Sequence, residues 1–494
     1  MAGFTDWTPP RFSPTDIPTL PSVTLSESER QTIGYLQMKC TGDRPNAELT
    51  KAYYRAAQTI DNLRIAIPDE LASRLRTLVG WARIPVDPYV ERLHVEGFRL
   101  PGETDVNATL GDIWSASGMD AEFPLATKDA LSMGRGFFLV GSGAEKGDPP
   151  RITVESPLSM AVQWDVTGRR AKAALQTYTE DEQSRAALYL PDRTLFLAQN
   201  ERREWELVDV DPHNFGYVPV HRMANDEDSD HRNGYSEITP SLISIIDAAC
   251  RRLMGLEVAS ELYSVPRELI LGASAEDFQD ANGNARKAWD AYVTKLRILE
   301  RDEEGNVPSF VQATAYDPAT FTRVIEMYAS QAAGEARALP QELGLYTDGN
   351  PISIESLNAM DTMRNRRALL KQRTFGVPVV EVMQTSLRFL NNGNLPPEFR
   401  RIAVDWMPPE LASLAQLADP LSKLIGVGSI PATSDVTLKR ASFSAVERAQ
   451  LEKDRGEQVP SAIVEALQNA AASTRQPAQT QQVNSGDSGA GSVG

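Results

Sequence analysis

The sequence predicts an α+β protein of several domains, and three observations lead to that class. With 494 residues, the chain is too long for one hydrophobic core. Its first 225 residues place helices before a run of short strands, the order typical of an α+β domain. Two long one-sided helices are expected further on, over 236–263 and 317–339, with a compact mixed segment between them.

The elements of the first 225 residues follow from apolar periodicity and from glycine and proline positions. Helices are expected over 26–38, 47–60, 70–79 and most of 113–133. Isolated strands are expected over 95–100 and 137–140. Strands are also expected over 152–155 and 161–164. An antiparallel meander is expected over 173–179, 186–190, 194–198 and 205–210, and residues 218–223 are expected to close it.

The first long helix carries one apolar stripe. Apolar residues recur at helical spacing at Leu242, Ile245, Ala249 and Leu253. Charged residues occupy the opposite face. Pro240 fits only a first helical turn, so the regular part is expected to begin near Thr239.

The second long helix is expected to open at Asp317-Pro318, an N-cap followed by proline at the first helical position. Val324 and Tyr328 lie on its apolar side. It is expected to end at Leu339-Pro340, because proline disfavours the helical conformation in the residue before it. Taken alone, the residues of the two long helices fit an ordinary helical hairpin in a globular core as well as they fit a more specialised helix pair.

The segment between the long helices is expected to hold strands at 267–272 and 309–313 and a short helix at 285–296. A module of about 50 residues is too small for a large core of its own, so we expect it to pack on a copy of itself or on a partner. After a loop at 340–353, helices are expected over 353–375 (stopped by Gly376 and Pro378), 379–390, 410–425 and from the capping box at 444–447 onward.

Composition argues against several classes of protein. The net charge of −17 is untypical of a protein that coats nucleic acid, but it suits a channel wall that repels phosphate. Cys40 and Cys250 form no disulfide framework, and a reducing environment is expected. The N-terminus does not read as a signal peptide, and no apolar run is long enough to span a membrane.

No catalytic group, cofactor site or metal site is expected. Residues 141–147 lack the spacing of a phosphate-binding loop and read as a polar turn. The histidines have no metal-ligand spacing. The acidic run 226–230, with Glu237 in the twelfth position, fits a calcium loop only in part, because His231 stands where that loop needs glycine. A solvated acidic loop is the preferred interpretation, and a divalent-ion site is the alternative.

A basic face is expected on the helix that follows the loop. Arg364, Arg367 and Lys371 are spaced by three and four residues, which places them on one side of that helix. Such a face is most often solvated or in contact with another subunit. Binding of DNA or of an acidic partner surface is the alternative.

Several short motifs occur in a characteristic order over residues 50–455. They are Tyr53-Tyr54, Leu78-Val79-Gly80-Trp81, residues 130–140, 155–160, 216–220, 338–345 and 350–357. The last two comprise a Pro-x-x-x-Gly loop, with Pro340 and Gly344, and a helix start rich in serine and glutamate. In this order the motifs resemble the portal proteins of tailed bacteriophages, most closely the portal class of long-tailed siphoviruses that infect actinobacteria.

The resemblance implies a portal architecture with a wing, a long-helix stem, a small α+β clip and a helical crown. The implied parts are an irregular arm (1–24), the wing (25–235), two stem helices (236–263 and 317–339), the clip (264–316), a tunnel loop (340–353), a wing helix region (354–404), the crown (405–472) and a disordered tail (473–494). It also assigns subunit packing in the stem to Leu242, Ile245, Ala249, Leu253, Val324 and Tyr328. The DNA-channel loop would consist of Gln341, Leu345, Tyr346, Thr347, Asp348, Gly349 and Asn350.

The function implied by the resemblance is structural, without catalysis or a cofactor. The chain would form a homo-oligomeric ring, usually a dodecamer, at one vertex of the viral capsid, after assembly in the host cytoplasm. Double-stranded DNA would pass through the ring during packaging and ejection. The implied partners are the terminase large subunit, the major capsid protein and scaffold, and the head–tail adaptor, with no membrane. Two alternatives stay open: a non-viral oligomeric scaffold and an unrecognised nucleic-acid-processing enzyme.

Overall fold

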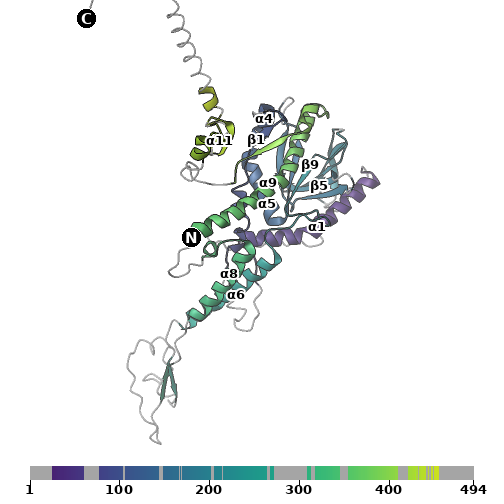
Figure 1. Cartoon of the computed structure of the whole chain (residues 1–494). Helices are drawn as coiled ribbons and strands as arrows, with labels where there is room; N and C mark the ends of the chain where they lie inside the picture. Colours follow the sequence, from purple (N-terminus) through teal and green to yellow (C-terminus); the bar gives the residue numbers. More distant parts are fainter. Residues whose placement is uncertain are drawn as a thin grey trace, which may run out of the picture. The chain divides into compact units, whose positions relative to one another are not determined.

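The computed structural model describes residues 25–60, 77–103, 106–143, 148–165, 167, 170–201, 205–213, 215–263, 268–271, 309–312, 318–344, 354–409, 421–431, 433–440, 443, 447–448 and 450–454. The chain divides into two compact units, and the first ends at Pro409. In the described residues, the first unit combines helices with four antiparallel sheets (Figure 1), which confirms the α+β class.

The N-terminal helix α1 (Glu27–Tyr54) begins with a capping box. The Ser26 N–H donates to Glu29 Oε2 at 2.8 Å, and the Glu29 N–H donates back to Ser26 Oγ, so two free N–H groups of the first turn are satisfied. Short helical turns follow at η2 (Trp81–Arg83) and α3 (Asp87–Val90). The helix expected at 70–79 lies mostly outside the described residues.

Two helices continue through a proline where the sequence predicts a break. Helix α1 contains Pro45 and is one helix, not the expected pair. Helix α9 (Ile354–Leu390) contains Pro378 and does not stop at Gly376. Buried residues lie on both sides of each proline: Leu36 and Ala47 in α1, Phe375 and Val379 in α9. An internal proline costs about 3 kcal/mol, and burial of these flanking side chains outweighs that cost.

Helices α4 (Ala108–Ala116) and α5 (Met119–Met133) confirm the helical region expected up to residue 133. Gly134 ends α5 with a φ of 89°. A Cβ atom at this position would lie 2.9 Å from the carbonyl oxygen of Gly234, so the turn has no room for a side chain. The chain then enters the buried strand β2 (Arg135–Gly141).

The expected four-stranded meander is confirmed, and the strand expected at 161–164 joins its edge to give a five-stranded antiparallel sheet of order β4-β5-β6-β7-β8. Its strands are β4 (Met160–Asp165), β5 (Arg170–Glu180), β6 (Gln183–Tyr189), β7 (Arg193–Gln199) and β8 (Trp205–Pro212). The expectation that residues 218–223 close this meander is wrong. Strand β9 (Val220–Ala224) instead pairs with β2, which lies between it and β3 (Arg151–Glu155). A buried strand needs a partner on both edges, because an unpaired buried N–H is costly.

The first long helix, α6 (Pro240–Tyr263), starts as predicted. Thr239 caps it by accepting a hydrogen bond from the Leu242 N–H at 3.2 Å. The second long helix, α8 (Ala319–Ala336), packs against α6 (Figure 1). Its expected end at Leu339 is wrong.

Helix α8 ends three residues earlier because its last turn closes on itself. Arg337 adopts a left-handed conformation with a φ of 53°, and the Ala338 N–H donates to the Ala333 carbonyl at 2.8 Å. This is the closure that commonly ends helices. Pro318 is the N-cap, not the first helical residue. Asp317 lies outside the described residues.

The two strands expected between the long helices are confirmed. Strand β10 (Glu268–Leu271) pairs antiparallel with β11 (Ser309–Gln312). The helix expected at 285–296, the arm at 1–24, the tail at 473–494 and most of the stretch at 410–425 lie outside the described residues. In the second unit, α11 (Asp435–Arg440) is a short helix.

The main core lies where α4, α5, β1 (Val95–Arg99), β2 and β12 (Ala403–Trp406) meet. Phe123 is at its centre, with ring centroids 5.8 Å from both Trp114 and Trp406 and 6.3 Å from Phe138. A short helical turn, η5 (Pro397–Arg400), connects α9 to β12, and β12 pairs with β1. The boundary expected between the wing helix region and the crown, at residue 405, therefore falls inside strand β12. The first unit continues to Pro409.

Asp129 on α5 provides a test of this burial. Burial raises the pKa of its carboxyl to about 6, and Lys51 opposes the shift only in part. Because the folded pKa is raised, the ionised carboxylate destabilises the fold at pH 7 and above, and the neutral acid does not. Asp129→Asn is therefore expected to raise the free energy of unfolding at pH 8 by about 1–3 kcal/mol.

Chemical denaturation at pH 8 and pH 4 measures this effect. The gain is expected to be mostly lost near pH 4, where the carboxyl is protonated in the folded chain and about half protonated in the unfolded chain. Asp112→Asn, at an exposed acid on α4, is the matched control and is expected to be neutral. An equal gain for Asp129→Asn at both pH values would rule out the ionisation as its cause.

Candidate functional site

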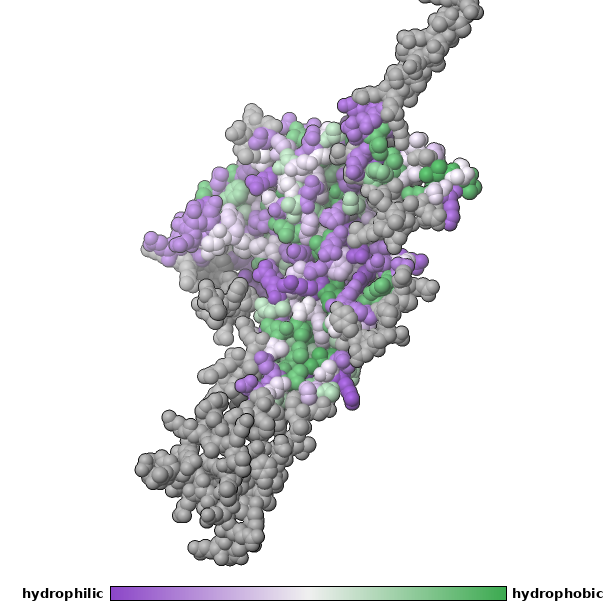
Figure 2. All heavy atoms as spheres, turned by 90° about the vertical axis from the view of Figure 1, so that its left-hand side faces the viewer, coloured by the Kyte–Doolittle hydropathy of each residue, from purple (hydrophilic) through white to green (hydrophobic). Residues whose placement is uncertain are grey.

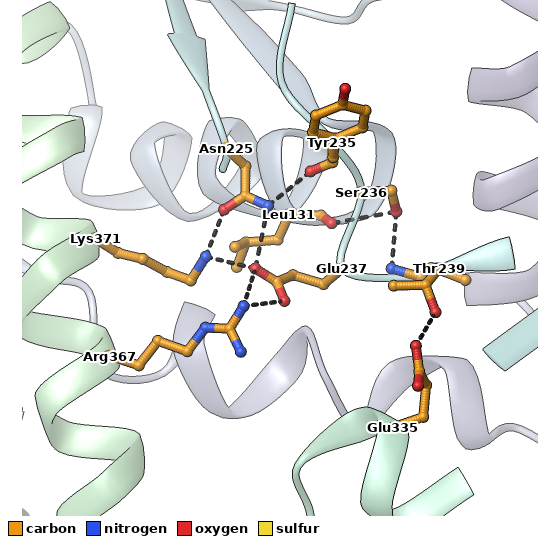
Figure 3. A network of polar contacts seen from close by, with 10 residues as sticks. Leu131, Asn225, Tyr235, Ser236, Glu237, Thr239, Glu335, Arg367 and Lys371 are labelled. Atoms are coloured by element: carbon orange, nitrogen blue, oxygen red, sulfur yellow. Dashed lines mark hydrogen bonds and ion pairs between the residues drawn. The ribbon is translucent and has the colours of Figure 1, made fainter. Parts of the chain in front are cut away.

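The residues that lead into α6 are tied to two other helices. Ser236 Oγ donates to the Ser132 carbonyl at 2.6 Å, and the Glu237 N–H donates to the Leu131 carbonyl at 2.8 Å, both at the end of α5. Thr239 Oγ1 donates to Glu335 Oε1 of α8 at 2.7 Å. The start of α6 therefore meets the ends of α5 and α8 at one junction (Figure 3).

A buried ion cluster lies at this junction (Figure 3). Glu237 accepts hydrogen bonds from Arg367 Nη2 at 3.0 Å and from Lys371 Nζ at 2.6 Å. Lys371 Nζ also donates to Asn225 Oδ1, and Asn225 Nδ2 donates to the Tyr235 carbonyl at 2.8 Å. Two positions on α9 thus hold the lead-in of α6 through charge-assisted hydrogen bonds.

The charges of this cluster shift its pKa values. Burial alone would raise the pKa of Glu237, but Lys371 and Arg367 outweigh burial and hold that pKa below its ordinary value. Burial lowers the pKa of Lys371, and Glu237 opposes that shift. Both partners of Nζ are oxygen acceptors, and one is the Glu237 carboxylate, so the contacts favour the ammonium form.

A second ion pair joins α9 to the start of the expected tunnel loop. The turn η4 (Pro340–Leu343) opens that loop, and Gly344 follows it with a φ of 83°. Arg364 binds Glu342 through both guanidinium Nη atoms, with Nη1 at 2.6 Å from Oε1. A bidentate pair fixes orientation as well as distance. Helix α9 therefore holds both the start of the expected loop and the residues that lead into α6.

The structure corrects the roles left open for the basic face. Arg364 and Lys371 are only 9% and 7% exposed, and all three basic residues bind carboxylates of the same chain. Their side chains are therefore not a solvated or DNA-binding surface. Periodicity placed them on one face correctly, but it gave no sign of their acceptors, Glu342 and Glu237.

The structure also corrects part of the expected subunit packing. Leu242 and Ala249 are fully buried in the chain's own core, so they have no surface left for another subunit. Ile245 packs against the same core and is partly buried. Leu253, Val324 and Tyr328 are half-buried, and their contact with a neighbour stays a prediction.

Met327 on α8 is 47% exposed, and the sequence pattern did not single it out. It lies three residues after Val324 and one before Tyr328. Figure 2 shows an apolar area on the helix pair, beneath a belt of hydrophilic side chains. The pair therefore keeps an apolar outer surface after its inner surface is buried.

Of the expected DNA-channel residues, the structure describes only Gln341. It lies in η4, half-buried, and its buried Oε1 accepts no hydrogen bond within the described residues. The residues Leu345, Tyr346, Thr347, Asp348, Gly349 and Asn350 lie outside the described ranges.

The calcium-loop alternative for residues 226–230 is not supported. Its twelfth-position ligand would be Glu237, whose carboxylate is bound by Lys371 and Arg367. Glu227 lies 3.7 Å from Arg222 and 3.6 Å from Arg232. Within the described ranges, no group of three or more His, Cys, Asp or Glu could hold a metal ion. No helix in the same ranges combines the length and apolar character needed to cross a bilayer.

Comparison with known proteins agrees with this architecture. The family model for phage portal proteins of the SPP1 Gp6-like type matches residues 35–459. The portal protein of Mycobacterium phage D29 is 32% identical over 419 residues, covering 83% of this chain and 84% of that protein. The portal protein of Mycobacterium phage L5 is 31% identical over 417 residues, covering 81% and 83%.

Among solved structures, a chain from the neck of a native GTA particle with C12 symmetry aligns over 77% of this chain and 95% of that chain. Its identity is 14% and its TM-score 0.37, too low to carry an argument. The family match and the two relatives each extend over more than four-fifths of the sequence. The chain therefore belongs to the phage portal proteins of the SPP1 Gp6-like family.

Proposed function

We propose that the chain is the subunit of a dodecameric ring through which double-stranded DNA enters a phage capsid and later leaves it. As a portal protein it is a structural component of the capsid vertex and forms a homo-oligomeric ring. An enzyme and a non-viral scaffold are thereby set aside. The subunit number and the passage of DNA are the proposed part.

The observation that carries the proposal is the junction on α9. One rigid helix holds the base of the α6–α8 pair through Glu237 and the base of the loop through Glu342. A conduit that bears force needs its wall and its constriction fixed to the same body. We propose that α6 and α8 are the stem, that residues 340–353 are the tunnel loop, and that the net charge of −17 keeps phosphate from adhering.

The proposed partners follow from the same assignment. Residues 264–316, as the clip, would meet the terminase large subunit during packaging and the head–tail adaptor afterwards. The wing (25–235 and 354–404) and the crown after it would face the major capsid protein and scaffold. Assembly would take place in the host cytoplasm before incorporation into the virion.

Light scattering and negative-stain imaging of the purified chain test the ring. The expected particle has about twelve times the 54.3 kDa mass of the chain and a central hole. The chain is also co-expressed with its capsid and scaffold proteins, in case ring assembly needs them. A chain that stays monomeric or dimeric in both preparations would contradict the proposal.

Deletion of residues 346–350 tests the loop. The ring is expected to keep its mass, because the stem and wing are untouched, while the amount of DNA packaged or retained falls at least about tenfold. The matched control replaces the same five residues by Gly and Ser, which separates loop length from side-chain identity. Normal packaging by the deletion variant would remove the loop from the mechanism.

A further inference from the structure

Helix α9 has a second face, beside the one that holds the ion pairs. Met363, Leu370 and Val377 are 66%, 60% and 59% exposed. They are spaced by seven residues, so they form one line along the helix. Their burial would remove a large apolar area from water, and exposed apolar patches of this kind mark interaction sites.

A shallow groove adjoins this line. Its volume is about 480 Å³, and its lining includes Leu369, Val377 and Val380 from α9 and Val404 and Trp406 from β12. Gly376 also lines it, and a Cβ atom there would make ordinary van der Waals contact with Trp406 Nε1 at 3.7 Å. The groove is therefore a mostly apolar recess large enough for a few side chains.

The stretch of α9 that carries the line is basic, although Glu381 also lines the groove. Residues 362–380 contain five basic residues and no acidic residue. Arg364, Arg367 and Lys371 are used within the chain, which leaves Arg366 and Arg373 on the exposed side. Among the ion pairs of the described residues, none includes Arg366 or Arg373.

We propose that this face, defined by Met363, Leu370, Val377 and the adjoining groove, binds the next copy of the chain in the ring. The inference rests on the ring proposed above. A closed ring uses two different complementary faces on each subunit, so every subunit must offer one face of each kind. Because the chain carries a net charge of −17, its copies repel one another, and an apolar face flanked by arginines favours contact with an acidic, apolar surface of a second copy.

The way α9 is held in place also favours a second copy of the chain as the partner of this face. The ion pairs on its inner side and the buried Phe375 and Val379 hold the helix to the body of the subunit. The exposed line is therefore presented in a fixed geometry, which lowers the entropy lost when a neighbour binds.

The double variant Leu370→Glu, Val377→Glu tests the face. It is expected to lower the fraction of chain in rings at least about tenfold, because it removes the apolar contact and places two carboxylates against the acidic surface of the second copy. Val208→Glu, on the edge strand β8, is the matched control, since Val208 is 59% exposed and lies outside the proposed face. Circular dichroism checks that the variant chain keeps its fold.

A photo-crosslinking residue at position 370 gives a second measurement, which does not depend on how the double variant folds. In rings mixed from ¹⁴N- and ¹⁵N-labelled chains, cross-links between differently labelled copies are expected. Cross-links only within one chain, for example to residues 421–454, or to capsid protein, would overturn the proposal.

If the wild-type chain forms rings and the double variant forms them equally well, the assignment of this face is wrong, and the proposed ring is unaffected. If the wild type forms none, the ring itself fails, and this inference with it.

Discussion

Glu237→Gln is expected to lower the free energy of unfolding by about 3–5 kcal/mol, the largest effect of any single change proposed for this chain. The substitution leaves Lys371 and Arg367 beside a neutral amide, and Lys371 is only 7% exposed. An uncompensated buried charge costs far more than a lost surface pair. Urea denaturation at pH 7 measures the shift in the unfolding midpoint.

Two controls separate this effect from the general loss of an ion pair. Glu381→Gln removes a carboxylate that is 49% exposed and lies 3.3 Å from His221, and it is expected to cost less than about 1 kcal/mol. Adding Lys371→Met to Glu237→Gln removes the stranded charge and is expected to restore much of the loss. If Glu237→Gln proved as mild as Glu381→Gln, the cluster would have no structural role.

The same carboxylate predicts a pH dependence. Because Lys371 and Arg367 hold the pKa of Glu237 below its ordinary value of 4.5, its ion pairs stabilise the fold above that value. That contribution is lost as the pH falls through the folded pKa. The difference between wild type and Glu237→Gln is therefore expected to shrink below about pH 4.

Arg364→Ala is expected to loosen the base of the tunnel loop while leaving the fold in place. The Arg364–Glu342 pair is bidentate, but Glu342 is 32% exposed, so solvent weakens the interaction to about 1–2 kcal/mol. Hydrogen exchange of the backbone amides at 341–344 is expected to become about tenfold faster, since 1.4 kcal/mol corresponds to a factor of ten.

A double-mutant cycle with Glu342→Gln tests the pairing itself. The two changes together are expected to have little more effect than either alone, because each removes the same contact. Additive effects would show that Arg364 acts through other neighbours. In packaging assays, the Arg364→Ala ring is expected to keep its mass and to retain less DNA.

Local sequence pattern was sufficient for the α+β class, for the four-stranded meander over 173–210 and for both long helices. In each case the signal lies within a few residues: alternation in the strands, and helical spacing in 240–263 and 319–336. The ordered motifs over residues 50–455 likewise pointed to the family that the comparisons show. These features are determined by the sequence alone because each depends on neighbours along the chain.

Only the tertiary structure decided the features that depend on distant contacts. Helices α1 and α9 continue through Pro45 and Pro378 because burial on each side outweighs the local cost, and local rules do not include that burial. Strand β9 pairs with β2 rather than β8 because a buried strand needs partners on both edges. The role of the basic face was likewise invisible in the sequence, since Lys371 finds its carboxylate 134 residues away, at Glu237. Periodicity tells which residues share a face, and packing in three dimensions decides what that face touches.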